Sequence, residues 1–245
     1  MLLLVMDTSS AVVTAAVHDG DSVVGSAVEH GAQSHGELLA PVIMRALAEA
    51  GARPGDLTHV CAGVGPGPFT GLRVGIVTAR VMAEALSIPV HGICSLDVLA
   101  FQAAADSGFT LGSFAVATDA RRKEVYLRTY DRGGRPASDP VVVKPADVGA
   151  ALASGPVVGP GAWLYPDVFT DAREPRELDG AAMAELVAGR LELAPELLLA
   201  PGRVLEELTL ELGAGLHVPP AHRSQAHGCV TRLRPAFSTA SGRRR

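Results

Sequence analysis

The sequence predicts an α/β fold of two lobes, each a mixed sheet flanked by helices. The chain opens with three apolar segments separated by turns, which indicates antiparallel strands within residues 1–28. Strand and helix patterns then alternate to about residue 105, an order typical of parallel strands joined by helices. Residues 113–130 again form two apolar segments around a polar turn. Each opening turn begins with an aspartate, Asp7 or Asp119, so we expect two lobes of related fold.

Composition excludes several classes of protein. The chain has 245 residues, 48% of them hydrophobic, which is enough for one large or two small cores. Its 21 basic and 26 acidic residues give a formal net charge of −5, so charge does not predict a nucleic-acid-binding body. We find no signal peptide and no apolar run of membrane-spanning length. The three cysteines are far apart and lack ligand spacing, which favours a reduced cytoplasmic setting and no metal.

The first long helix is predicted from His35 to Ala50. Ser34 and Glu37 have the spacing of a capping box, and Gly51 is a typical helix end. Pro41 lies inside the helix and should kink it. The apolar residues form a broad stripe (Leu39, Ile43, Ala46, Leu47, Ala50) and a narrow one (Leu38, Val42). Two stripes indicate two neighbours, the protein's own sheet and a second element.

A glycine- and proline-rich turn, Gly65 to Pro68, separates a predicted strand at 59–64 from the next helix. The turn lacks the Lys-Ser/Thr pair of a phosphate-binding P-loop and the third glycine of a dinucleotide fingerprint. Two alternatives stay open. The turn either presents free backbone N–H groups to an anion or partner, or packs the helix closely on its sheet.

The second long helix is predicted from Phe69 to Leu86. Small residues recur at intervals of four, at Gly71, Gly75, Ala79 and Ala83. Such a ridge allows another backbone to approach closely.

The remaining elements divide the chain into three parts. Strands are predicted at 88–90, 113–118 and 125–130, and helices at 95–105, 147–153 and 180–193, whereas Gly159-Pro160-Gly161 is interpreted as a loop. Residues 213–245 contain six arginines and no acidic residue, as in a basic disordered extension. We therefore expect an N-terminal lobe over 1–104, a C-terminal lobe over 105–195, and a basic tail over 196–245.

Four motifs follow one another along the chain: Asp7-Thr8-Ser9, Ser34-His35-Gly36-Glu37-Leu38-Leu39, Gly65-Pro66-Gly67-Pro68-Phe69-Thr70-Gly71-Leu72-Arg73, and Asp119-Ala120-Arg121-Arg122-Lys123-Glu124-Val125-Tyr126. In order and spacing they resemble the TsaB family, the dimerisation subunits of the bacterial complex that forms threonylcarbamoyladenosine in tRNA. The resemblance covers Met1 to about Leu193. It implies a two-lobed actin-like ATPase fold of the sugar-kinase and heat-shock-protein superfamily, in a protein that is not itself the transferase.

The resemblance also implies partners. Members of the family pair with a catalytic paralogue, TsaD, and an ATPase, TsaE, and reach tRNA through the complex. Two helices of the first lobe meet their TsaD counterparts as a four-helix bundle, and they correspond here to residues 35–50 and 69–86. Partner contacts are therefore expected at His35, Leu38, Leu39, Val42, Arg45, Phe69, Leu72, Arg73, Ile76 and Arg80. A homodimer through the same face is expected when the partner is absent.

The same resemblance implies no catalytic residues and no cofactor. TsaD carries an H-x-x-x-H metal motif, whereas here His91 has no second histidine four residues on. Actin-like kinases hold phosphates in two turns with glycine after aspartate, but Thr8 follows Asp7 and Ala120 follows Asp119. We expect a vestigial nucleotide cleft of Asp7, Thr8, Ser9 and Asp119. The alternatives are a small kinase with ATP turnover and a homodimeric scaffold.

Overall fold

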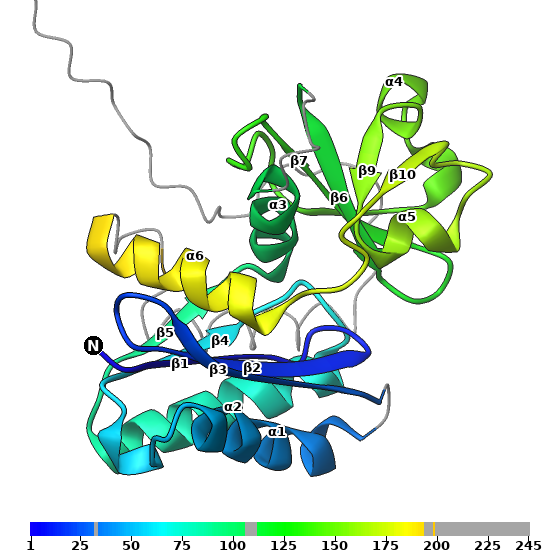
Figure 1. The fold of residues 1–245 in the computed structure, drawn as a ribbon. Helices are drawn as coiled ribbons and strands as arrows, with labels where there is room; N and C mark the ends of the chain where they lie inside the picture. Colours follow the sequence, from blue (N-terminus) through cyan, green and yellow to red (C-terminus); the bar gives the residue numbers. More distant parts are fainter. Residues whose placement is uncertain (32–33, 106–111, 194–197, 199–245) are drawn as a thin grey trace, which may run out of the picture.

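The computed structural model describes residues 1–31, 34–105, 112–193 and 198, and it contains two five-stranded sheets (Figure 1). The first sheet has the order β3-β2-β1-β4-β5. Strands β1 to β3 pair antiparallel, whereas β4 and β5 run parallel to β1. Their bounds are β1 Leu3–Asp7, β2 Val12–His18, β3 Val23–His30, β4 His59–Gly63 and β5 Val90–Ile93. The predicted opening strands are confirmed, and β5 lies two to three residues later than expected.

The second sheet repeats this topology in the order β8-β7-β6-β9-β10. Strand β6 takes the place of β1, because it pairs antiparallel with β7 and parallel with β9. The bounds are β6 Phe114–Asp119, β7 Val125–Tyr130, β8 Val141–Val143, β9 Pro156–Val158 and β10 Asp171–Arg173. The predicted α/β architecture of two related lobes is therefore confirmed.

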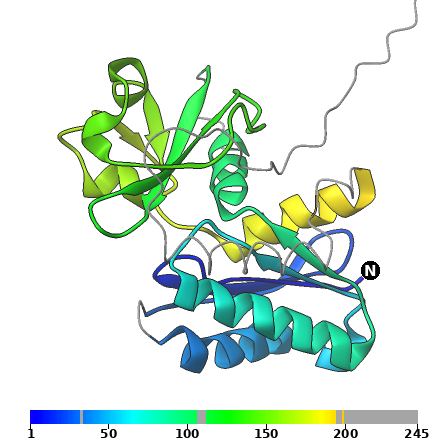
Figure 2. The same ribbon diagram turned by 180° about the vertical axis from the view of Figure 1, so that it is seen from behind.

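Helices cover both faces of the first sheet (Figures 1 and 2). Helices α1 (His35–Glu49) and α2 (Phe69–Leu86) lie side by side on one face. Helix α6 (Gly180–Leu193) packs on the other face against β1, β2 and β3. The chain thus returns to the first lobe, although residues 105–195 were expected to stay together in the second.

The second lobe is joined to the first through helix α3 (Ser95–Ala105), which packs on β6 and also contacts α6. One hydrophobic cluster is continuous through these elements, from Leu3 and Val5 of β1 to Phe114 and Val116 of β6. A separate cluster lies under α4 (Ala150–Ala153) and α5 (Pro160–Leu164). The two lobes therefore share a core across α3 and α6.

Several local predictions need correction. Ser34 makes no side-chain capping bond, so the predicted capping box is absent, and α1 continues through Pro41 to Glu49. Gly159 and Pro160 do not form a simple loop, because they precede and begin α5. The predicted helix at 147–153 is a 3-10 turn at Pro145–Asp147 followed by α4. Apart from Leu198, the predicted basic tail lies outside the described residues.

The ends of α1 and α2 share one hydrogen-bond pattern but differ in their left-handed residue. Gly51 (φ 63°) ends α1, where Ala52 N–H donates to the Leu47 carbonyl. Ser87 (φ 57°) ends α2, where Ile88 N–H donates to the Ala83 carbonyl. Both are Schellman ends, for which glycine is the residue without steric cost.

Among the described residues, no helix is both long and apolar enough to cross a bilayer.

Exchanging residues at these two ends should shift stability in opposite directions. We expect Ser87→Gly to raise the free energy of unfolding by about 0.5 kcal/mol, because relief of the left-handed conformation slightly exceeds the added freedom of the unfolded chain. Gly51→Ala should lower it by about 1 kcal/mol for the converse reason. Urea unfolding of both variants measures this, and equal signs would contradict it.

Candidate functional site

The end of β4 and the glycine-rich turn that follows it enclose the end of strand β1. A Cβ atom on Gly63 would lie 1.7 Å from Asp7 Oδ2, and one on Gly67 would lie 2.2 Å from the Ser9 carbonyl oxygen. No side chain fits at either position, because the β1–β2 turn already occupies the space. Of the two alternatives left open by the sequence, the structure therefore shows close packing, with the chain's own turn as the occupant.

Thr8 joins this turn to helix α2. Its hydroxyl donates to the Gly71 carbonyl at 2.8 Å and accepts from Gly75 N–H at 3.1 Å. A Cβ atom on Gly71 would lie 2.5 Å from the Thr8 carbonyl oxygen, and one on Gly75 would lie 2.5 Å from Thr8 Oγ1. The small-residue ridge of α2 therefore receives this protein's own turn, which corrects its predicted use as a contact with a partner backbone.

Asp7 lies beneath the turn and is almost fully buried. Its Oδ1 accepts hydrogen bonds from Ser9 N–H and Ser9 Oγ–H, both at 2.7 Å, and its Oδ2 accepts one from Ser95 Oγ–H at 2.6 Å. Burial raises the pKa of Asp7, while these hydrogen bonds oppose the increase. The carboxyl group is thus held inside the protein rather than presented to a substrate.

His35 fastens the start of α1 to the same turn. Its Nε2 lies 2.7 Å from the Ser10 carbonyl oxygen, which can only accept, so the ring donates from Nε2. The residue is buried. His35 is therefore an internal contact, which corrects its predicted position in a partner interface.

Burial also corrects other predicted partner contacts. Leu39, Val42, Leu72 and Ile76 are each at most 1% exposed and belong to the core of the first lobe. Leu38 and Phe69 are partly buried against the same core, and Arg80 is partly buried. Arg73 is exposed, as is Arg45, which forms an ion pair with Glu29. The second neighbour of α1, indicated by its two stripes, is α2 of the same chain.

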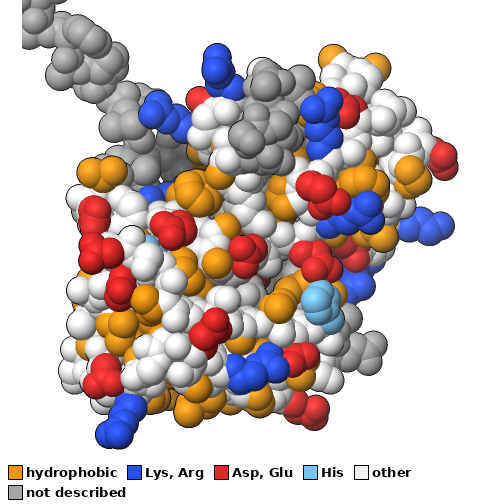
Figure 3. Space-filling model, in the orientation of Figure 1, with side chains coloured by type: hydrophobic (Ala, Val, Ile, Leu, Met, Phe, Trp, Pro, Cys, Tyr) orange, Lys and Arg blue, Asp and Glu red, His pale blue; other side chains and the backbone are white. Residues whose placement is uncertain are grey.

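A different set of side chains faces away from the sheet on these two helices. On α1 the exposed residues include Ala40, Met44 and Ala48, spaced by four, and Met44 is 55% exposed. On α2 Val77 and Val81 are 43% and 60% exposed. We call these five residues the outer helix face. Hydrophobic side chains are visible along the lower edge of Figure 3, where Figure 1 places α1 and α2.

An open cleft lies between the lobes. Ser9, Ser10 and Pro68 line it from the first lobe, and Thr118, Asp119, Arg121 and Trp163 line it from the second. Arg176 stacks on the Trp163 ring, with 3.5 Å between the guanidinium carbon and the ring centroid. Of the residues predicted as a vestigial nucleotide site, Ser9 and Asp119 reach this cleft, whereas Asp7 and Thr8 lie buried below it.

Comparison with known proteins gives the family. A family model described as "TsaD: tRNA N6-adenosine threonylcarbamoyltransferase" matches residues 23–159, more than half of the chain. The chain belongs to this family.

Relatives named TsaB support the TsaB branch of this family. The chain is 30% identical over 130 residues to "tRNA threonylcarbamoyladenosine biosynthesis protein TsaB" of Bacillus subtilis, covering 53% of this chain and 55% of the relative. It is 31% identical over 132 residues to TsaB of Escherichia coli, covering 54% and 56%. The aligned part thus spans about half the length of these relatives, which support a role in tRNA threonylcarbamoyladenosine biosynthesis.

The solved structures extend the likeness over both lobes. "YeaZ from Pseudomonas aeruginosa" has a TM-score of 0.67 and 28% identity, covering 83% of this chain and 97% of that one. A second Pseudomonas aeruginosa structure, titled an uncharacterised protein with similarity to peptidase YEAZ, has a TM-score of 0.70 and 28% identity, covering 82% and 95%. With the shared topology of the two sheets, this confirms the two-lobed actin-like fold.

In this TsaB-like chain the histidines of the parallel strands β4 and β5 stack on each other. The ring centroids of His59 and His91 are 5.8 Å apart. Burial lowers the pKa of both imidazoles, and each ring is therefore neutral near pH 7. Among the described residues, no cluster of three or more His, Cys, Asp or Glu side chains has an arrangement that could hold a metal ion.

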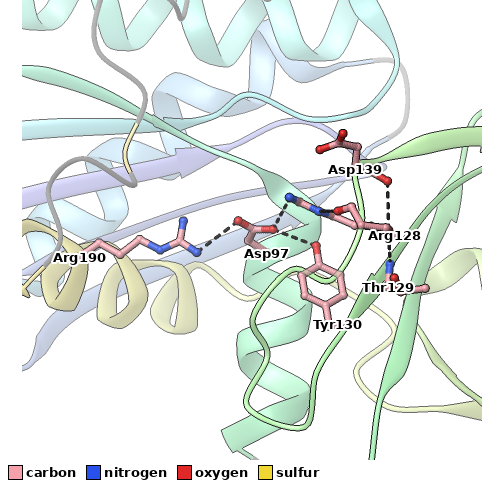
Figure 4. Close-up of polar contacts among 7 residues, drawn as sticks. Asp97, Arg128, Thr129, Tyr130, Asp139 and Arg190 are labelled. Carbon is pink, nitrogen blue, oxygen red and sulfur yellow. Dashed lines mark hydrogen bonds and ion pairs between the residues drawn. The ribbon is translucent and has the colours of Figure 1, made fainter. Parts of the chain in front are cut away.

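The sequence reasoning missed a buried polar cluster around Asp97 of α3 (Figure 4). Asp97 Oδ1 accepts from Arg128 Nη1 at 2.8 Å and from the Tyr130 hydroxyl at 2.9 Å, both on β7. Its Oδ2 accepts from Arg190 Nη2 of α6 at 3.2 Å. Burial and the nearby carboxylate raise the pKa of Tyr130, which stays a hydrogen-bond donor. Asp97 thus joins β7 of the second lobe to α6 on the first. Its sequence signals were a charged residue inside each of two largely apolar elements, Asp97 in α3 and Arg128 in β7.

Proposed function

We propose that the chain is a non-catalytic subunit that binds and activates a TsaD-type transferase, which threonylcarbamoylates the adenosine next to the tRNA anticodon. The observation that carries this proposal is the outer helix face. Met44, Val77 and Val81 expose apolar surface on two helices that lie side by side. Exposed apolar side chains gathered on one face are typical of a protein–protein interface.

The geometry of the outer helix face suits another pair of helices. Ala40 and Ala48 stand one turn on either side of Met44, so the backbone of α1 is accessible beside a flexible apolar side chain. Exposed Arg73 and Glu84 lie at either end of the apolar residues of α2 and supply a polar rim. An apolar centre with a polar rim is the usual composition of a helix-packing interface.

The β1–β2 turn supports a non-catalytic role. Asp7 is enclosed by Ser9 and Ser95, and Thr8 is engaged by Gly71 and Gly75. These polar groups stabilise the junction of β1 with α1 and α2, which places the outer helix face on a rigid support.

We propose that the partners also include a TsaE-type ATPase and that tRNA is reached through the complex in the cytoplasm.

Charge introduced on the outer helix face should prevent assembly. We expect the unchanged chain to form a one-to-one complex with its TsaD-type partner, measured by light scattering. Val81→Glu should weaken this complex roughly 30-fold or more, because a carboxylate would be desolvated in an apolar interface. Ile76→Glu is unsuitable for the test, since Ile76 is 1% exposed and its replacement would disrupt the core.

Val142→Glu is the matched control. Val142 is a valine with 55% exposure, similar to Val81, but it lies on β8 in the other lobe. This variant should assemble normally. Equal assembly of the Val81→Glu variant, with its fold intact by circular dichroism, would contradict the proposed interface. A homodimer of the isolated chain that is also lost in Val81→Glu would show the same face covered by a second copy. Saturable ATP turnover by the chain alone would favour the kinase alternative.

A further inference from the structure

The tip of the β6–β7 hairpin carries three consecutive basic residues in the left-handed conformation. Arg121, Arg122 and Lys123 have φ angles of 63°, 49° and 64°. Residues with a side chain adopt this conformation at a cost in free energy, whereas glycine adopts it freely. A turn selected only for its backbone would therefore favour glycine here, so the side chains themselves need an explanation.

Hydrogen bonds fix this turn in place. Arg121 N–H donates to Asp119 Oδ1 at 2.8 Å, Glu124 N–H donates to the Arg121 carbonyl at 2.8 Å, and Ala120 N–H donates to the Glu124 carbonyl at 3.0 Å. The three basic side chains are exposed. The backbone thus holds them outward at one end of the second sheet.

A fourth cation extends the tip. Strand β8 pairs with β7 so that Val143 lies opposite Val125, which places Lys144 next to the tip. Lys123 and Lys144 are the two lysines of the whole chain. Within the described residues, Arg121 is ion-paired with Asp119 at 3.4 Å, and no ion pair is formed by Arg122, Lys123 or Lys144. We call Arg121, Arg122, Lys123 and Lys144 the basic tip. It is a local concentration of positive charge on a chain with a net charge of −5.

The basic tip lies next to the start of α2. Arg121 and Pro68 line the same cleft, and the Tyr126 hydroxyl is 3.5 Å from the Gly67 carbonyl. Pro68 directly precedes α2, one of the two helices of the outer helix face. The basic tip is therefore next to the N-terminal end of a helix that carries part of the outer helix face.

We propose that the basic tip is an RNA contact, which neutralises backbone phosphates of the tRNA bound by the assembled complex. This inference rests on the proposed function, because it takes the RNA class from it. Lysine and arginine side chains bind phosphates without reading the bases, so the contact positions the tRNA and strengthens binding in a salt-dependent way. The residues that make this contact are on the TsaB-like subunit and not on its TsaD-type partner.

The test uses the full-length chain in its complex with the TsaD-type partner and an unmodified tRNA transcript as the probe. Arg122→Glu/Lys123→Glu changes the two tip residues that make no ion pair and leaves the Arg121–Asp119 pair in place. We expect the tRNA dissociation constant at about 0.1 M salt to rise roughly 10-fold or more, and the slope of log K against log salt to become shallower by about 1.5, as expected for two lost phosphate contacts.

Arg132→Glu/Arg135→Glu is the matched control. It makes the same change in charge at the turn beyond the opposite end of β7, where both side chains are exposed. This variant should bind tRNA within about 2-fold of the unchanged complex. An equal loss in both variants would overturn the proposal, because only net charge would then matter. Unchanged tRNA binding by the tip variant would also overturn it.

Light scattering on the same samples separates this inference from the proposed function. Failure of the unchanged chain to form the heterodimer refutes the proposed function. A normal heterodimer whose tRNA affinity falls only in the tip variant supports the RNA contact. Loss of the heterodimer itself in the tip variant would show that the basic tip binds protein, which contradicts the RNA contact.

Discussion

Replacing Asp97 with alanine should lower the free energy of unfolding by about 3–5 kcal/mol, the cost of breaking a buried ion pair from one side. Arg128 is 3% exposed, so loss of the carboxylate would leave its guanidinium buried without a counter-ion. The Tyr130 hydroxyl would lose its acceptor as well. Because Asp97 also holds Arg190 of α6, the contact between the lobes should loosen before the sheets unfold. Denaturant unfolding measures the first effect, and hydrogen exchange in α6 measures the second.

Arg45→Ala is the control for this prediction. The Arg45–Glu29 pair combines the same chemical groups at the surface, where such pairs contribute about 0–1 kcal/mol. In a second variant, Asp97→Ala/Arg128→Met, both members of the buried ion pair are replaced by uncharged residues. This variant should be more stable than Asp97→Ala alone, because no unpaired guanidinium stays buried. An Asp97→Ala variant no less stable than Arg45→Ala would show that the buried cluster does not hold the lobes.

Sequence reasoning predicted the long elements because their patterns are local. Helices α2, α3 and α6 have the predicted bounds, and β7 does as well. Strands β8, β9 and β10 were missed, since three residues are too few to show an alternation of apolar and polar positions. Each is placed by pairing with a neighbouring strand, β8 with β7, β9 with β6 and β10 with β9, and this pairing leaves no local signal in the sequence.

The predicted partner residues show a second limit of prediction from sequence. Periodicity identified the stripes of α1 but not the elements that cover them. Val42 packs in the core and α1 meets α2, so residues assigned to a partner are covered by the chain itself. The exposed residues Met44, Val77 and Val81 were not selected, because the sequence alone does not distinguish an apolar side chain that faces solvent from one that lies in a core.

The spacing of the glycines in α2 was recognised in the sequence, but the residues that they contact could not be predicted from it. Gly71 and Gly75 are more than 60 residues from Thr8, whose side chain and backbone they accommodate. Helix periodicity predicted a smooth ridge correctly. Only the fold shows that the ridge receives the β1–β2 turn instead of another protein.

Gly63→Ala should be among the most destabilising single-methyl changes in this chain. The new Cβ would lie 1.7 Å from Asp7 Oδ2 and 2.7 Å from Asp7 Cγ, so the carboxyl group must move. Moving it breaks the 2.6 Å hydrogen bond from Ser95 within a buried site. We expect a loss of about 3 kcal/mol, at the upper end for overpacking, since strain and an unsatisfied polar group add together. Gly189→Ala is the control, because nothing lies within 4 Å of its new Cβ in α6, and it should stabilise the helix by about 0.5–1 kcal/mol.

A double-mutant cycle tells whether the clash with Asp7 causes this loss. Asp7→Ala alone should destabilise the protein by about 1–3 kcal/mol, because Ser9 and Ser95 lose their acceptor. In Gly63→Ala/Asp7→Ala the alanine enters the space that the carboxyl group has left, so the combined loss should be at least about 1 kcal/mol smaller than the sum. Strictly additive losses would mean that the close approach of Asp7 is not the cause and that the contact of the new Cβ with Ser95 Oγ, at 3.0 Å, causes the loss instead. Because the same turn holds His35 of α1 and Gly71 of α2, the double variant should also recover partner binding wherever it recovers stability.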